Sequence, residues 1–139
     1  MSRNVDELIA LIRQRVGDQP VELGLVLGSG LGHLADAVEG VAIPYDDLPG
    51  FPHAGVSGHS PKLVIGELVG RRVAVFGGRA HYYESGKGDA MRVPLEVLRG
   101  LGGSQLILTN AAGSLQPDMP PGSLMLLNDH INFSGLNPL

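Results

Sequence analysis

Residues 21–32 have the sequence VELGLVLGSGLG, a mostly apolar run that ends abruptly in a glycine-rich stretch. A short apolar run bounded in this way is typical of a buried β-strand. The glycines of 28–32 allow a tight turn that directs several backbone N–H groups toward one point, as in an anion-binding loop. A tight structural turn explains the glycines equally well, so this stretch alone leaves both interpretations open.

Hydrophobic spacing predicts the elements around this strand. Apolar residues recur at helical spacing over 4–16, which predicts an amphipathic helix. Two strands, 63–69 and 72–76, are expected to form a hairpin joined at Gly70-Arg71.

Further along, a helix is predicted over 89–101, with Asp89 as its cap and Pro94 inside its first turns. Buried strands are predicted over 106–109 and 123–127. Strands and helices that alternate, with one inserted hairpin, predict an α/β fold with a mixed central sheet flanked by helices. The chain ends at Leu139 without a closing helix, so residues 1–139 are expected to be part of a single, apparently truncated domain.

The composition is that of a globular protein, because 43% of the 139 residues are hydrophobic and 17% are charged. A formal net charge of -4 argues against a nucleic-acid partner. The chain has no cysteine, which excludes disulfides and thiolate zinc sites, and no metal site is predicted. The acidic start does not resemble a signal peptide, and no apolar run reaches the ~18 residues that span a bilayer. A cytoplasmic protein without a membrane partner is therefore expected.

Two known nucleotide-binding motifs are not matched by this sequence. The dinucleotide fingerprint requires a third glycine where this chain has His33, so a Rossmann domain is disfavoured. The P-loop requires Ser or Thr after its lysine, whereas Lys87 is followed by Gly88.

Three more loops carry residues suited to an anion. Arg79 and His81 stand two residues apart after a predicted strand, so in extended geometry both side chains point the same way. A guanidinium offers a planar fork of donors that suits phosphate. His59 lies in a Gly- and Ser-rich loop, and the small residues Asn110–Gly113 at a strand end let a ligand approach the backbone. Each loop has a structural alternative. Arg79 and His81 could lie in a solvent-exposed polar loop, His59 in a surface turn, and the small residues Asn110–Gly113 could serve tight packing.

Taken together, these blocks resemble the trimeric purine nucleoside phosphorylases. The blocks are LGSGLG at 27–32, GH at 58–59, GRAHYYE at 78–84 and TNAAG at 109–113, extended by DHIN at 129–132 and NPL at 137–139. Their order and spacing are similar to those of the N-terminal half of that family. The resemblance implies a nucleoside phosphorylase-like fold, purine nucleoside and inorganic phosphate as substrates, no cofactor, and assembly as a homotrimer.

The resemblance also assigns roles to individual residues. His81 and Glu84 match the family's catalytic positions, with Glu84 placed to orient Arg79 and His81. Tyr83 matches the tyrosine that meets the ribose, and Phe133 lies near the place of an aromatic residue that covers it. The implied phosphate contacts come from Ser29, His59, Arg79, Ala80, His81 and the backbone of Ala111.

The implied reaction is phosphate-dependent cleavage of the N-glycosidic bond of purine nucleosides, in purine salvage. Ser60-Pro61 stands after His59 where the family usually has Ala-Gly, which puts the pose of His59 in question. The family's purine-binding residues have no counterpart in this sequence. One alternative is therefore a non-catalytic remnant that binds phosphate or associates with other subunits. A second is a relative of the methylthioadenosine phosphorylases, which are less similar in the first glycine loop and in the Asn-Ala-Ala-Gly block.

Overall fold

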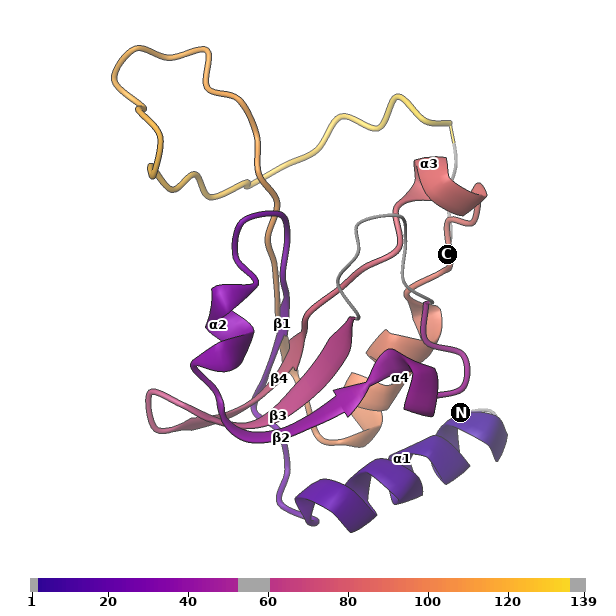
Figure 1. Cartoon of the computed structure of the whole chain (residues 1–139). Coiled ribbons are helices and arrows are strands. Elements are labelled where there is room, and N and C mark those ends of the chain that lie inside the picture. Colours follow the sequence, from indigo (N-terminus) through magenta and orange to yellow (C-terminus); the bar gives the residue numbers. More distant parts are fainter. Residues whose placement is uncertain (1–2, 53–60, 136–139) are drawn as a thin grey trace.

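The computed structural model describes residues 3–52 and 61–135, and residues up to Leu108 form one mixed β-sheet with helices on both faces, followed by a segment without helix or strand (Figure 1). The elements, in chain order, are α1 (Arg3–Val16), β1 (Leu23–Val26), α2 (His33–Asp36), β2 (Glu39–Pro44), the 3-10 turn η1 (Tyr45–Asp47), β3 (Lys62–Leu68), β4 (Arg71–Phe76), α3 (Tyr82–Ser85), α4 (Arg92–Gly100) and β5 (Gln105–Leu108).

The strand order across the sheet is β2-β3-β4-β1-β5. β1 is the central strand of the parallel part of the sheet, because it pairs in parallel with β4 on one side and with β5 on the other. β3 runs antiparallel to both β2 and β4. The carboxyl ends of β1, β4 and β5 therefore meet at one edge of the sheet, which is where ligands bind in open α/β folds.

Each face of the sheet buries its own apolar cluster. α1 and α4 cover one face and α2 lies against the other (Figure 1). The spacing of the apolar residues in α1 places one side of the helix in the core, with Val5, Leu8, Ile9 and Ile12 at most 5% exposed. The predicted helix over 4–16 is confirmed.

The predicted hairpin is also confirmed, and its turn lies one residue earlier than expected. β3 and β4 pair antiparallel up to Leu68 and Arg71, which leaves Val69 and Gly70 as a two-residue loop. Both loop residues have positive φ, 51° and 71°, as a type I′ hairpin turn requires.

The predicted helix over 89–101 begins later than expected. Its first residue is Arg92 and its N-cap is Met91, so the prediction of Asp89 as the cap is wrong. Pro94 is therefore the third helical residue, a position whose N–H has no intrahelical partner, so a proline is tolerated there.

Two strand predictions need correction. A strand requires a hydrogen-bonded neighbour, and residues 123–127 pair with none in the described part of the chain, so this predicted strand is absent from 3–52 and 61–135. β5 forms one residue earlier than the predicted strand over 106–109, and it is an outer strand of the sheet that is not buried: Leu106, Ile107 and Leu108 are 39–66% exposed.

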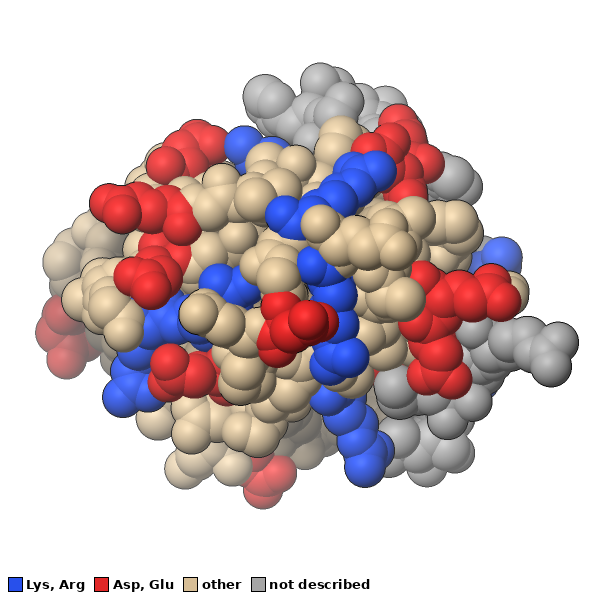
Figure 2. All heavy atoms as spheres, turned by 90° about the horizontal axis from the view of Figure 1, so that it is seen from below, with Lys and Arg blue, Asp and Glu red and all other residues tan. Residues whose placement is uncertain are grey.

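The face of the molecule that carries α1 has both basic and acidic side chains, with a row of basic ones along its middle and acidic ones to either side (Figure 2). Several neighbours of opposite charge form ion pairs, among them Arg15 with Asp47 at 2.8 Å and Lys62 with Asp36 at 2.9 Å. No helix within residues 3–52 and 61–135 has the length and apolar character to cross a membrane.

Candidate functional site

Three loops leave the sheet side by side at its carboxyl edge. β1 leads into the glycine loop that starts at Gly28, β4 leads into the loop with Arg79, and β5 leads into Thr109. Because these strands are parallel neighbours, residues far apart in the sequence come within hydrogen-bonding distance there. The predicted strand-end loops at 28–32, 78–81 and 109–113 thus lie along one edge.

Thr109 joins the β1 and β5 ends of this edge. Its Oγ1 accepts a 2.7 Å hydrogen bond from the backbone N–H of Gly28 and donates one of 3.0 Å to the carbonyl of Val26. Its own N–H donates to the same carbonyl at 3.0 Å. A Cβ on Gly28 would stand 2.7 Å from the Thr109 carbonyl oxygen, so only glycine fits this close approach.

Arg79 links the β4 loop to the same corner. Its guanidinium Nη1 donates to the backbone carbonyl of Thr109, and the side chain is partly buried. A guanidinium carries five N–H donors, so this bond fixes the side chain and leaves further donors for an anion. Arg79, the glycine loop and the 109–113 loop therefore meet in one place.

His81 and Glu84 are close to each other on the turn that follows Arg79. The backbone N–H of His81 donates to Glu84 Oε2 at 2.9 Å, and the N–H of Glu84 donates to the His81 carbonyl at 3.0 Å. These reciprocal bonds order the start of α3. Tyr83 is 81% exposed, and its ring stacks on the His81 imidazole at a centroid distance of 5.0 Å and an interplanar angle of 11°.

The remaining predicted site residues are less closely tied to this corner. Ser29 and Ala111 are exposed on the glycine loop and on the 109–113 loop, and Ala80 lies between Arg79 and His81. Phe133 belongs to the extended segment after β5 and is 92% exposed. His59 lies outside the described residues.

Tyr45, which the sequence did not indicate as a site residue, supports the Arg79 loop from inside the protein. The side chain is 2% exposed, and its hydroxyl donates a 2.8 Å hydrogen bond to the carbonyl of Gly78. Burial raises the pKa of the Tyr45 phenol far above its ordinary value, so the hydroxyl stays neutral. The one sequence signal at this position is the tyrosine itself, an aromatic residue directly after Pro44.

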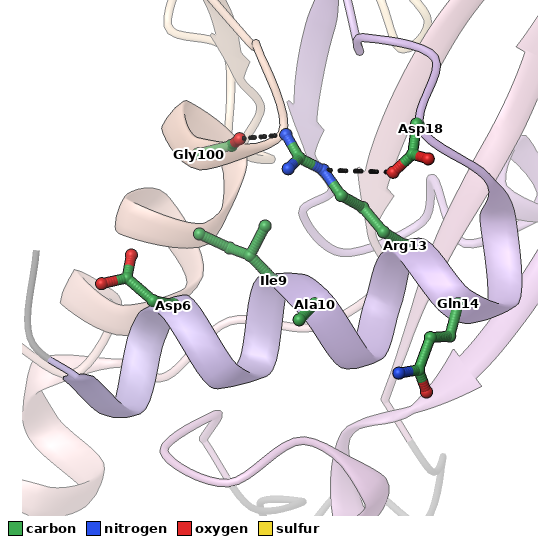
Figure 3. Close-up of a pocket in the computed structure, with 7 residues that line it drawn as sticks. All are labelled: Asp6, Ile9, Ala10, Arg13, Gln14, Asp18 and Gly100. Carbon is green, nitrogen blue, oxygen red and sulfur yellow. Dashed lines mark hydrogen bonds and ion pairs between the residues drawn. The ribbon is translucent and has the colours of Figure 1, made fainter.

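A cavity of about 500 Å³ lies elsewhere, between α1 and α4 (Figure 3). Arg13 crosses it, donating to the carbonyl of Gly100 at 3.1 Å and approaching Asp18 at 4.0 Å. The Arg13 side chain thus hydrogen-bonds to the C-terminal end of α4 and links it to α1. The cavity contains none of the strand-end residues, so its size does not make it the functional site.

The chemistry of the carboxyl edge suits a small anion. A fixed guanidinium, an imidazole and backbone N–H groups in glycine-rich loops are donors that recognise phosphate or carboxylate. In the part of the chain that the structure describes, no three His, Asp or Glu side chains gather as metal ligands do.

The sequence of this chain matches a known protein family. Residues 22–139 match the family described as the Phosphorylase superfamily, a stretch that includes every strand and all three edge loops. The chain belongs to this superfamily.

Relatives with similar sequences include purine nucleoside phosphorylases. Purine nucleoside phosphorylase 1 of Geobacillus stearothermophilus is 45% identical over 136 residues, covering 97% of this chain and 49% of the relative. Purine nucleoside phosphorylase 1 of Bacillus subtilis is 43% identical over 140 residues, covering 100% of this chain and 51% of the relative. The chain thus spans about half the length of these curated relatives.

Solved structures of the superfamily share the fold. A purine nucleoside phosphorylase in complex with ribose-1-phosphate has a TM-score of 0.73 and 41% identity, over 84% of this chain and 43% of that chain. The Schistosoma mansoni enzyme in complex with inosine has a TM-score of 0.72 and 39% identity, over 84% and 41%. The prediction of a phosphorylase-like mixed sheet is confirmed.

Proposed function

We propose that this protein catalyses phosphate-dependent cleavage of purine nucleosides and that the present chain supplies the phosphate and ribose side of the site. The observation that carries the proposal is the meeting of Arg79 with the glycine loop and the 109–113 loop through Thr109. Relatives named purine nucleoside phosphorylase, one of them in complex with ribose-1-phosphate, give the anion-binding edge a substrate.

In this proposal the phosphate lies over the carboxyl edge. Arg79 and His81 supply side-chain donors to it, and Glu84 holds the loop that carries His81. Tyr83 and Phe133 would meet the ribose, and His59 would add a contact from a segment outside the described residues. The other phosphate contacts would be Ser29, the backbone of Ala80 and the backbone of Ala111.

The reaction requires positioning and charge stabilisation more than covalent help from the protein. A phosphate oxygen attacks C1′ as the C1′–N9 bond breaks, and the purine leaves with the bonding electrons and takes up a proton. The ribosyl group has oxocarbenium character in the transition state, as in glycoside hydrolysis. A phosphate dianion fixed beneath it is both the nucleophile and the counter-charge, and its fixed donors cost no reorganisation.

The proposal leaves part of the site to be supplied from elsewhere. Stabilising the departing purine needs a polar partner near N7 and O6, and base preference depends on it. Assembly as a homotrimer, a role in purine salvage, a cytoplasmic location and independence of a cofactor stay predictions from the sequence.

The test is to incubate the protein, expressed from its complete reading frame, with inosine in the presence and absence of inorganic phosphate. We expect hypoxanthine release only with phosphate. Release without phosphate would identify a hydrolase and refute the proposal. Phosphate binding without any cleavage would favour a non-catalytic, phosphate-binding remnant. Cleavage of methylthioadenosine in preference to inosine would favour a relative of the methylthioadenosine phosphorylases.

A further inference from the structure

Tyr45 is a buried polar residue that the proposed reaction does not use. It lies in η1, 33 residues before Gly78, and its hydroxyl donates to the Gly78 carbonyl at 2.8 Å. The Gly78 carbonyl belongs to the peptide group that joins Gly78 to Arg79, so this hydrogen bond fixes that peptide group. The hydroxyl thereby acts on the loop through its backbone, from inside the protein.

The Tyr45 ring is held firmly enough to fix that peptide. Phe51 packs edge-on against it, with centroids 4.9 Å apart and an interplanar angle of 71°. Phe51 in turn stacks on Phe76, the last residue of β4, at 6.3 Å and 18°. The backbone N–H of Tyr45 donates to the Pro61 carbonyl at 3.0 Å. The hydroxyl therefore has a defined position relative to the end of β4.

The two glycines after β4, Gly77 and Gly78, form a segment whose backbone conformation the Tyr45 hydroxyl can restrict. Gly77 N–H donates to the Lys62 carbonyl at 2.9 Å, and a Cβ on Gly78 would stand 2.5 Å from the Pro61 Cβ. Gly77-Gly78 therefore passes close to the start of β3 with backbone alone. Two successive glycines are conformationally permissive, so an external hydrogen bond to Gly78 restricts the direction in which Arg79 leaves the sheet.

We propose that Tyr45 is a positioning residue for phosphate recognition: its hydroxyl fixes the Gly78–Arg79 peptide and so directs the Arg79 guanidinium toward the anion. The inference rests on the proposed function and names a residue that does not touch the substrate. It assigns Tyr45 an effect on phosphate binding that its place in the core alone would not give it.

The test is Tyr45→Phe in the protein expressed from its complete reading frame, which removes the hydroxyl and keeps the ring against Phe51. We expect the KM for phosphate to rise roughly three- to tenfold, as the loss of one hydrogen bond implies, while kcat and the KM for inosine change little. Ile12→Val, a core substitution on α1, is the matched control: we expect it to lower the melting temperature and to leave the KM for phosphate unchanged.

A second measurement follows the loop without using activity. Backbone hydrogen exchange over residues 77–86 should be faster in Tyr45→Phe than in Ile12→Val. Unchanged exchange and an unchanged KM for phosphate, or equal changes in both variants, would overturn the inference. If the wild type binds phosphate without cleaving inosine, the proposed function fails, and the Kd for phosphate replaces KM in the same comparison.

Discussion

The backbone N–H of Gly28 donates a 2.7 Å hydrogen bond to Thr109 Oγ1, across 81 residues of sequence. The same hydroxyl donates to the Val26 carbonyl, so one threonine side chain joins the ends of β1 and β5. The backbone carbonyl of Thr109 accepts a hydrogen bond from the Arg79 guanidinium. The geometry of the candidate phosphate site therefore depends on a residue that need not touch the ligand.

Thr109→Val replaces this hydroxyl by a methyl group of similar size. The Gly28 N–H loses its acceptor, so we expect the free energy of unfolding to fall by about 0.5–1.5 kcal/mol. Thr109→Ser keeps the oxygen and should lose less. Urea denaturation of the two variants and the wild type measures the difference, and a larger loss in the serine variant would contradict the role assigned to the hydroxyl.

Gly28 and Gly32 provide a matched pair within one loop. A Cβ at Gly28 would stand 2.7 Å from the Thr109 carbonyl oxygen and 2.9 Å from the Asn110 Cα, both backbone atoms, whereas at Gly32 nothing lies within 4 Å. We expect Gly28→Ala to cost about 1–3 kcal/mol through overpacking and to impair phosphate binding. Gly32→Ala, with φ of -55°, should stay within about 0.5 kcal/mol of the wild type. Thermal unfolding distinguishes them, and equal losses would show that the close approach is not what requires Gly28.

Arg79→Ala removes the guanidinium from the carboxyl edge. The loss of a charge-assisted contact worth about 1.5–3 kcal/mol should raise the KM for phosphate roughly ten- to hundredfold. Arg71→Ala is the control, because Arg71 is exposed at the opposite end of β4 and pairs with Glu22 at 3.1 Å. Steady-state kinetics at varied phosphate measures both variants. Equal phosphate KM values for Arg79→Ala and the wild type would mean that Arg79 does not bind the anion.

Val69 is the described part's single non-glycine residue with positive φ, in the turn of the β3–β4 hairpin. A β-branched side chain is strained in this conformation, and Val69 is 96% exposed, so it gains no packing in return. Val69→Asn should stabilise the protein by about 1 kcal/mol, because asparagine tolerates the left-handed region. Val69→Ala should gain less. A melting temperature below that of the wild type for the asparagine variant would contradict the assigned turn.

Elements with a regular apolar pattern could be predicted from the sequence. The helical spacing of Val5, Leu8, Ile9 and Ile12 predicted α1, and the runs on either side of Gly70 predicted the β3–β4 hairpin. Both patterns are local: helical spacing gives α1 one buried side, and the continuous apolar runs give β3 and β4 two buried faces, so pattern and structure agree. β2 lacks such a pattern: it contains Gly40, ends at Pro44 and has one buried residue, Ile43.

β2 forms because of a cross-strand contact that its own sequence does not reveal. Gly40 lies opposite Gly66 of β3, and a Cβ on Gly66 would stand 2.5 Å from the Gly40 Cα. This close pairing depends on two glycines 26 positions apart. The predicted strand at 123–127 failed for the converse reason, because an apolar run without a paired neighbour has no ladder to join; Leu124 there is 98% exposed.

The candidate site was predictable in its loops and less so in its supports. Glycine-rich stretches after strands indicated where Gly28, Arg79 and Asn110 would lie. Neither Thr109 Oγ1 nor the Tyr45 hydroxyl could be assigned its partner from the sequence, since both partners are backbone atoms brought close by the sheet order. Side chains that position a loop leave a weaker sequence signal than those that bind the ligand.

The most direct test of the central claim follows both products of one reaction. Protein from the complete reading frame is incubated with inosine and inorganic phosphate, with hypoxanthine measured by absorbance and ribose 1-phosphate by phosphorus NMR. The proposed function predicts equal amounts of the two products and none of either when phosphate is omitted. Free ribose in place of ribose 1-phosphate, or no turnover at any phosphate concentration, would contradict it.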